Sequence, residues 1–195
     1  PILSVVGPGG IGKTRLAIAA AEEFRRAFPD GVRFVDFTAV RNESLLAQSV
    51  CDALSLNSRE SSDRSVPDTL ATFLRTRRML LVLDNCEHVV DGAAALIAHL
   101  LASTAELRII VTSREYLSIP GEYVFHLGAL STEDTHDVSA AVELFTRRAS
   151  SALAGFELTD ANHQAVQQIC RRLDGLPLAI ELACTRLNVL SVHDL

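Results

Sequence analysis

The residues best suited to chemistry lie near the start of the chain, in a segment rich in glycine. Residues 7–14 are Gly-Pro-Gly-Gly-Ile-Gly-Lys-Thr, which matches the phosphate-binding pattern G-x-x-x-x-G-K-[ST] at every fixed position. Glycines let successive backbone N–H groups turn toward an anion, and a following helix adds its positive end. The compact ammonium of Lys13 can reach terminal phosphate oxygens, and the hydroxyl of Thr14 can bind magnesium. The segment therefore predicts a phosphate site.

Lys13 is the only lysine among the 18 lysines and arginines of the sequence. A planar arginine fork is too wide to replace an ammonium that folds back over a tight loop. A glycine-rich turn that binds nothing is the alternative, but an apolar run precedes the motif and an amphipathic segment follows it, as a strand, loop and helix would. We expect nucleotide binding by Gly7, Gly9, Gly10, Ile11, Gly12, Lys13, Thr14 and Arg15.

Asp84 ends the apolar run 79–83, which is typical of a buried parallel strand. An acid at that place can hold magnesium through water, opposite a phosphate loop. The alternative is an aspartate that only caps the next turn. Because the phosphate loop is present, we favour Thr14 and Asp84 as the metal ligands.

Hydrolysis of a nucleotide also needs a group that orients water, often an acid beside the metal carboxylate. The residue after Asp84 is Asn85, which cannot act as a base. Glu87 is the nearest substitute, and a solvated turn residue is an equally good interpretation of it. The candidate catalytic residues are thus Asp84 and Glu87, and the sequence predicts slow or absent turnover.

Arg114 follows an apolar run at residues 107–112 and ends the segment Thr112-Ser113-Arg114. If that strand lies beside the strand before the glycine loop, the guanidinium would point toward the terminal phosphate and distinguish tri- from diphosphate. A surface arginine at a strand end is the alternative. Gly175-Leu176-Pro177 lies between two expected helices and could be an ordinary helix stop and restart.

Alternating apolar and amphipathic segments predict an α/β fold with a five-stranded parallel sheet. Strands are expected at 2–6, 32–37, 79–84, 107–112 and 123–127. Besides the helix after the glycine loop, helices are expected at 45–56, 67–77, 91–103, 133–153, 160–173 and 177–190, with a loop at 57–66. The phosphate site would lie at the carboxyl ends of the strands. Strands stop near residue 130, so we expect a nucleotide-binding domain at 1–130 and a helical subdomain at 131–195.

Composition limits the remaining possibilities. The 195 residues carry a net charge of −6, with basic pairs scattered among acids, which argues against a DNA-binding stripe. No apolar run approaches membrane-spanning length, and no signal-peptide pattern opens the chain. The four cysteines lack metal-site spacing and sit in apolar segments, so we expect buried, reduced thiols in a cytoplasmic protein.

In this order and spacing the motifs resemble the NB-ARC (AP-ATPase) branch of the STAND signal-transduction NTPases. The similarity is greatest to large bacterial transcriptional regulators of the LuxR and SARP types. The residues that carry it are Gly7–Thr14, Leu80–His88, Thr112–Arg114, Ile119–Glu122 and Gly175–Ala183.

The resemblance implies a P-loop NTPase of three αβα layers followed by a small helical subdomain that continues beyond the chain. It implies a switch in which ADP holds a closed form and ATP, with Mg2+, opens it for self-association. Asp84 would be the metal-side acid, Arg114 the sensor of the terminal phosphate, and Pro177 would pack near the adenine. DNA would be contacted only through domains outside this chain, and no membrane is involved.

Two other functions remain as alternatives. An actively hydrolysing AAA-type ATPase would need an efficient catalytic acid, and Asn85 argues against it. A small-molecule kinase on the same fold would need an acceptor pocket and a lid inserted in the core, and the sequence shows neither. His193-Asp194 resembles a motif that the family carries further along the chain, but it follows Pro177 too closely to be that motif.

Overall fold

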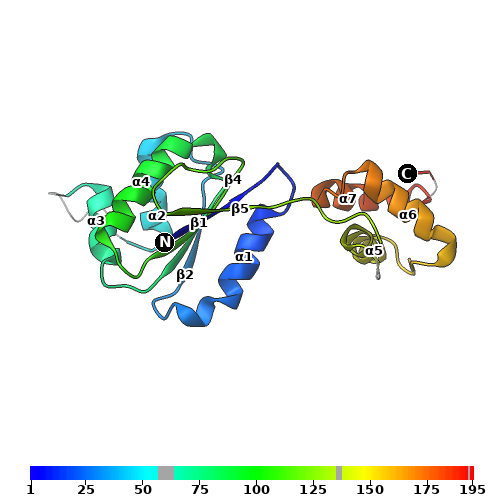
Figure 1. The fold of residues 1–195 in the computed structure, drawn as a ribbon, viewed down its shortest axis with the longest axis horizontal. Coiled ribbons are helices and arrows are strands. Elements are labelled where there is room, and N and C mark those ends of the chain that lie inside the picture. Colours follow the sequence, from blue (N-terminus) through cyan, green and yellow to red (C-terminus); the bar gives the residue numbers. More distant parts are fainter. Residues whose placement is uncertain (57–63, 135–137, 193) are drawn as a thin grey trace. The chain divides into compact units, whose positions relative to one another are not determined.

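The computed structural model describes residues 1–56, 64–134, 138–192 and 194–195. Its backbone divides into two compact units, which Figure 1 shows as a sheet with flanking helices and a group of helices. The first unit consists of Pro1–Gly7 and Lys13–Leu127, and the second of Pro8–Gly12 and Gly128–Leu195.

The first unit is built on a five-stranded sheet in which all neighbouring strands are parallel. The strands are β1 (Ile2–Val6), β2 (Val32–Asp36), β3 (Leu80–Asp84), β4 (Arg108–Ser113) and β5 (Glu122–His126). They lie in the order β2-β3-β4-β1-β5. The predicted α/β class and five-stranded parallel sheet are therefore confirmed, and each expected strand is shifted by one residue at most at either end.

The register of the strands brings the chemically important residues to one edge of the sheet. Val6 of β1 lies opposite Ser113 of β4, so the glycine loop begins beside the end of β4. In the same way Asp36 of β2 lies opposite Asp84 of β3. Because parallel strands place all their carboxyl ends together, residues that follow β1, β3 and β4 meet at this edge.

Helices cover both faces of the sheet. Helix α1 (Lys13–Glu23) packs on one face, where Ala17 and Ala21 contact a cluster that includes Val82. On the other face lie α2 (Leu46–Ala53), α3 (Val66–Leu74) and α4 (Val90–Ser103), and Figure 1 shows these layers. Because helices cover both faces, all five residues of β3 are buried, and all of them except Asp84 are apolar.

Local signals set the ends of several helices differently from the sequence prediction. The helix expected at 45–56 is preceded by a 3-10 turn, η2 (Glu43–Leu45), capped by the Asn42 side chain, and α2 ends at Ala53. It stops there because Ser55 adopts a left-handed backbone, which a helix cannot continue through. Helix α3 starts after the Ser65 cap and ends at Leu74 rather than at residue 77. Of the loop expected at 57–66, residues 57–63 lie outside the described residues.

The second unit contains the three helices α5 (Ala140–Ala152), α6 (Asp160–Arg172) and α7 (Pro177–Cys184), followed by the 3-10 turn η5 (Thr185–Asn188). Their apolar faces form a core around Phe145, Val166 and Ile180. The expected helix 133–153 is shorter at its start, and 135–137 lie outside the described residues. The expected helix 177–190 gives way to η5 after Cys184.

Gly175 occupies a position that no other residue fits. Its φ is +63°, in the left-handed region, and Leu130 N donates to its carbonyl at 3.0 Å. A Cβ atom at this position would lie 2.1 Å from Leu130 O. The glycine is therefore required by a close backbone approach as well as by the helix end, which extends the stop-and-restart interpretation of this motif.

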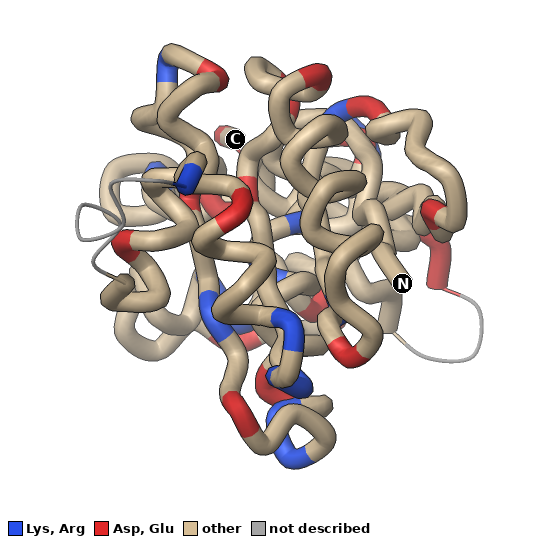
Figure 2. The backbone as a smooth tube through the Cα atoms, turned by 90° about the vertical axis from the view of Figure 1, so that its left-hand side faces the viewer, with Lys and Arg blue, Asp and Glu red and all other residues tan. Residues whose placement is uncertain are grey.

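Charged residues of both signs alternate along the chain. Figure 2 shows acidic and basic segments interleaved on the backbone in that view, as the scattered arginine pairs predicted. Among the residues that the structure describes, every helix is too short or too polar to cross a lipid bilayer.

Candidate functional site

The glycine segment folds as a strand, a turn and the start of a helix. Strand β1 ends at Val6, and α1 begins at Lys13. Between them Gly10 and Gly12 have φ values of +75° and +102°, a conformation that residues with side chains rarely adopt. Gly7 N is 3.4 Å from Ser113 O, which ties the start of the segment to the end of β4. Backbone geometry therefore favours glycine at one fixed position of the motif, Gly12, and at one variable position, Gly10.

Lys13 is a buried cation at the start of α1. Its side chain is folded back, and Nζ donates to Gly7 O at 2.8 Å. Burial lowers the pKa of Lys13, since it penalises the ammonium form. The Glu87 carboxylate acts in the opposite direction, and the Arg114 guanidinium adds to the lowering. A bound anion would favour the charged ammonium, so this lysine suits a phosphate ligand.

Asp84 is buried at the end of β3 and is held by two hydroxyl groups. Thr14 Oγ1 donates to Asp84 at 2.8 Å from Oδ1 and 3.0 Å from Oδ2. Thr112 Oγ1, from β4, donates to Oδ1 as well. The motif Thr112-Ser113-Arg114 did not by itself indicate a role for Thr112. The parallel register, which pairs Leu83 with Val111, places Thr112 beside Asp84 and could have revealed it.

The residues around Asp84 fit a magnesium ion. Mg2+ takes oxygen ligands and is usually held by one or two carboxylates together with phosphates and water. Thr14 and Asp84 supply a hydroxyl and a carboxylate within hydrogen-bond distance of each other, on the side where the phosphate loop begins. Within the described ranges no group of three or more His, Cys, Asp or Glu side chains could hold a metal by itself. Thr14 and Asp84 would supply two of the oxygen ligands of a magnesium ion, and phosphate or water the others.

Glu87 and Arg114 form an ion pair across the same edge of the sheet. Glu87 lies in the 3-10 turn η4 (Cys86–His88), which follows β3, and Arg114 follows β4. Arg114 Nε is 3.3 Å from Glu87 Oε1. The strand of Arg114 does lie beside β1, as the sequence argument required. The guanidinium, however, is engaged by an acid that the sequence analysis treated as a separate candidate.

Asn85 connects this ion pair to the strands. With its nitrogen turned toward Glu87, the Asn85 amide donates to Oε1 at 3.1 Å and Oε2 at 3.2 Å, and its oxygen accepts from Thr38 Oγ1 at 3.1 Å. The opposite orientation would set the amide oxygen against a carboxylate. Asn85 also has a left-handed backbone, with φ of 65°, which asparagine tolerates better than most residues.

The other predicted binding residues lie in different places. Gly9 and Arg15 are exposed and Ile11 is buried. Residues 8–12 group with the helical unit, where Leu178 N donates to Gly10 O at 3.1 Å. Pro177, one residue earlier, is the first residue of α7. Sequence reasoning did not foresee a role for Leu178, because a backbone N–H carries no residue-type signal.

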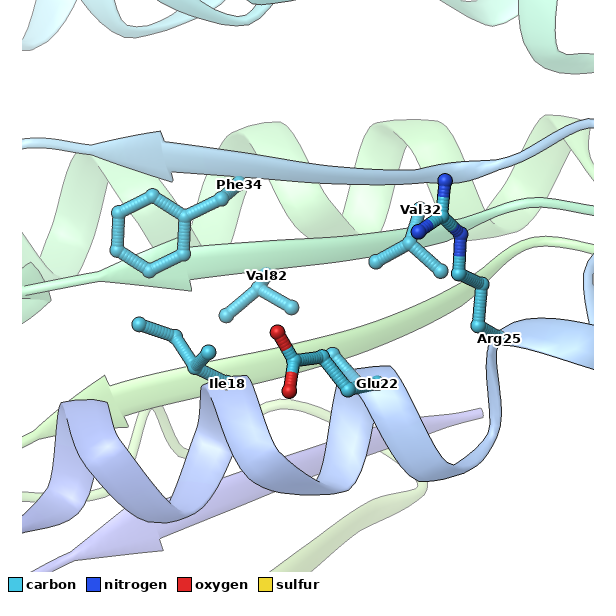
Figure 3. Close-up of a pocket in the computed structure, with 7 residues that line it drawn as sticks. Ile18, Glu22, Arg25, Val32, Phe34 and Val82 are labelled. Carbon is cyan, nitrogen blue, oxygen red and sulfur yellow. The ribbon is translucent and has the colours of Figure 1, made fainter.

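A pocket beside α1 is lined by few polar side chains. Ile18 and Glu22 of α1, Arg25, Phe34 of β2 and Val82 of β3 line it with two other residues. Figure 3 shows Phe34 and Ile18 at one end, Val82 and Glu22 in the middle, and Arg25 at the other end. The pocket lies beside the edge strand β2, whose Phe34 is 42% exposed. It lacks the cluster of polar groups that distinguishes the edge near Asp84.

The glycine loop joins the inner strand β1 to α1, and an acid ends β3, which lies two positions away in the sheet. This arrangement defines a P-loop NTPase fold. The chain belongs to the NB-ARC family: the model of the NB-ARC domain matches residues 1–141. This confirms the family resemblance found in the motifs.

Relatives and solved structures are similar over nearly the whole chain. An HTH-type transcriptional regulator of Mycobacterium tuberculosis is 43% identical over 192 residues, which cover 97% of this chain and 20% of that protein. The regulatory protein AfsR of Streptomyces griseus is 33% identical, with 95% of this chain and 18% of AfsR covered. The chain thus spans about a fifth of these relatives.

Two solved structures share the fold at low identity. A signal transduction ATPase with numerous domains (STAND) and a tetratricopeptide repeat sensor, from Pyrococcus horikoshii, has a TM-score of 0.62 at 16% identity, covering 94% of this chain and 27% of that one. The ORC2 protein of Aeropyrum pernix, solved as ADPNP and ADP complexes, has a TM-score of 0.59 at 16% identity, covering 96% and 54%.

Proposed function

We propose that the chain is the nucleotide-binding switch module of a bacterial transcriptional regulator, which binds ATP or ADP with Mg2+ and hydrolyses ATP slowly or not at all. The observation that carries the proposal is the constellation of Lys13, Thr14 and Asp84 at the edge where β1 and β3 end. A buried ammonium beside a hydroxyl and carboxylate pair suits a magnesium-bound phosphate chain.

Each residue of the motif would have its own role in binding. Gly7 would begin the turn beside the end of β4, the backbone N–H groups of Gly9, Gly10, Ile11, Gly12 and Arg15 would surround the phosphates, and Lys13 would neutralise their charge. Thr14 and Asp84 would hold Mg2+, directly or through water, and the ion would supply positive charge to offset that of the phosphates. Arg114 would bind the terminal phosphate, and Pro177 would pack near the adenine.

Slow turnover follows from the residues around Asp84. Asn85 is an amide and cannot accept a proton from water. Glu87 is the remaining acid, but its carboxylate accepts from Asn85 and is paired with Arg114. A carboxylate whose oxygens already accept from two donors is less available to orient an attacking water. Asp84 and Glu87 would therefore support at most a low rate of hydrolysis.

Coupling between nucleotide and protein state would depend on the two parts of the chain, a nucleotide-binding domain at 1–130 and a helical subdomain at 131–195. A ligand shifts such an equilibrium only if it binds the two states with different affinity. ATP and ADP differ by one phosphate, so Arg114 is the residue that could produce that difference. Exchange of ADP for ATP would then permit self-association, while DNA would be contacted by parts of the regulator outside this chain.

Steady-state turnover separates this proposal from an actively cycling AAA-type ATPase. Purified protein is mixed with ATP and Mg2+, and released phosphate is followed over an hour, with Lys13→Ala as the blank for contaminating activity. We expect turnover at or near that blank. Many ATP molecules hydrolysed per minute, with the activity lost in Glu87→Gln, would contradict the switch and favour the cycling enzyme.

A further inference from the structure

Glu87 is held firmly while its partner is free to move into solvent. The Glu87 side chain is 18% exposed and that of Arg114 is 67% exposed. The residues are 27 positions apart and reach each other from η4 and from the end of β4. An exposed guanidinium on a flexible stem can change partner at little cost, whereas a carboxylate packed beside two strand ends cannot follow it.

The Asn85 amide accounts for the fixed position of Glu87. It donates to both carboxylate oxygens, while the Asn85 backbone N–H donates to Thr112 Oγ1 at 3.0 Å. Thr112 is in turn bonded to Asp84. A carboxylate in place of this amide would face Glu87 at about the same distance and repel it. Asn85 therefore has two effects: its amide cannot act as a base, and it holds in place the Glu87 carboxylate that pairs with Arg114.

We propose that Glu87 is a specificity-determining residue, which lowers the affinity of this site for ATP relative to ADP by competing with the γ-phosphate for Arg114. The inference rests on the proposed function, in which Arg114 binds that phosphate. ATP must displace Glu87 from the guanidinium with its γ-phosphate, whereas ADP lacks that phosphate and leaves the pair intact. The ion pair thus lowers the affinity for ATP selectively and favours the ADP-bound form.

The test measures equilibrium affinities for ADP and for a non-hydrolysable ATP analogue by isothermal titration calorimetry. Glu87→Gln keeps the size of the side chain and removes the charge. Because exposed ion pairs have modest strength, we expect the affinity for the analogue to rise about 2- to 5-fold and that for ADP to change less. Glu115→Gln, which removes the same charge from an exposed neighbour of Arg114, is the matched control and should leave the ratio unchanged.

A double-mutant cycle decides whether the effect passes through Arg114. In the Arg114→Ala background, Glu87→Gln should no longer alter the ratio of the two affinities. The proposal is overturned if Glu87→Gln strengthens both nucleotides equally, weakens the analogue, or changes the ratio as much without Arg114 as with it. Failure of the wild-type chain to bind either nucleotide would be a different result, since it would reject the proposed function itself.

Discussion

Thr14 Oγ1 donates to Asp84 Oδ1 at 2.8 Å, although the two residues are 70 positions apart in the chain. The bond joins the first turn of α1 to the carboxyl end of β3. Thr112 completes the contact from β4, so the carboxylate is oriented before any ligand arrives. Such preorganisation is what a magnesium ligand needs, since the geometry of that ion is demanding.

Replacement of this carboxylate should remove the magnesium dependence of binding. We expect the wild-type chain to bind ATP at least about tenfold more tightly with Mg2+ than with EDTA, and Asp84→Asn to lose most of that difference. Fluorescence titration with a labelled ATP analogue in the two buffers measures it. Asp91→Asn, at an exposed acid in the first turn of α4, serves as control. An unchanged magnesium effect in Asp84→Asn would exclude Asp84 as a metal ligand.

Loss of the guanidinium of Arg114 should affect the two nucleotides unequally. A hydrogen bond to a charged group contributes about 1.5–3 kcal/mol, so Arg114→Ala should weaken ATP roughly 10- to 100-fold and ADP much less. Competition titrations with both nucleotides give the two values. Arg108→Ala, at the start of β4, should change neither affinity. Equal losses for ATP and ADP in Arg114→Ala would remove its sensor role.

The backbone approach at Gly175 predicts a stability difference between two glycines of the helical unit. Gly175→Ala places a Cβ atom 2.1 Å from Leu130 O, whereas Gly155, with φ of +82°, has nothing within 4 Å. Both substitutions strain a left-handed backbone, at about 1 kcal/mol or somewhat more. Only Gly175→Ala adds a clash, so its melting temperature should fall clearly further. Equal melting temperatures for the two variants would show that the close approach of Leu130 does not destabilise Gly175→Ala.

The four free cysteines should be unreactive in the folded chain. All are buried, and burial raises the pKa of Cys86 and Cys170 to about 12 and that of Cys184 to about 11. Burial also raises the pKa of Cys51. A thiol stays protonated, and therefore unreactive, at pH values well below its pKa. Reaction of the native chain with a disulfide reagent at pH 8 should therefore be very slow, and it should become complete in denaturant. Rapid labelling of the native chain would contradict this.

The sequence predicted the sheet well because its strands are continuous apolar runs bounded by polar residues. Helix ends were less certain, since the sequence did not show that Ser55 adopts a left-handed backbone or that the last helical segment tightens into η5 after Cys184. Spacing identified Lys13 and Thr14 as candidates, and the position of Asp84 at the end of an apolar strand identified the acid, because a strand-loop-helix pattern has few geometries.

Contacts between candidates could not be predicted in the same way. The sequence placed Glu87 and Arg114 in separate motifs, and only the pairing of β3 with β4 brings them together. The amide of Asn85 was interpreted as a missing base, and its bond to Glu87 depends on a turn whose backbone the residue types did not specify. Side-chain pairing across strands is a tertiary property, so composition and periodicity carry little information about it.

The central claim is that this chain binds nucleotide through Lys13. Equilibrium titration with ATP and with ADP in the presence of Mg2+ tests it most directly, comparing wild type, Lys13→Ala and the exposed-site control Arg26→Ala. We predict saturable binding of both nucleotides by wild type and control, and a loss of at least about 100-fold in Lys13→Ala, whose circular dichroism spectrum should match wild type. Equal affinity in Lys13→Ala, or no binding by the wild-type chain, would contradict the account.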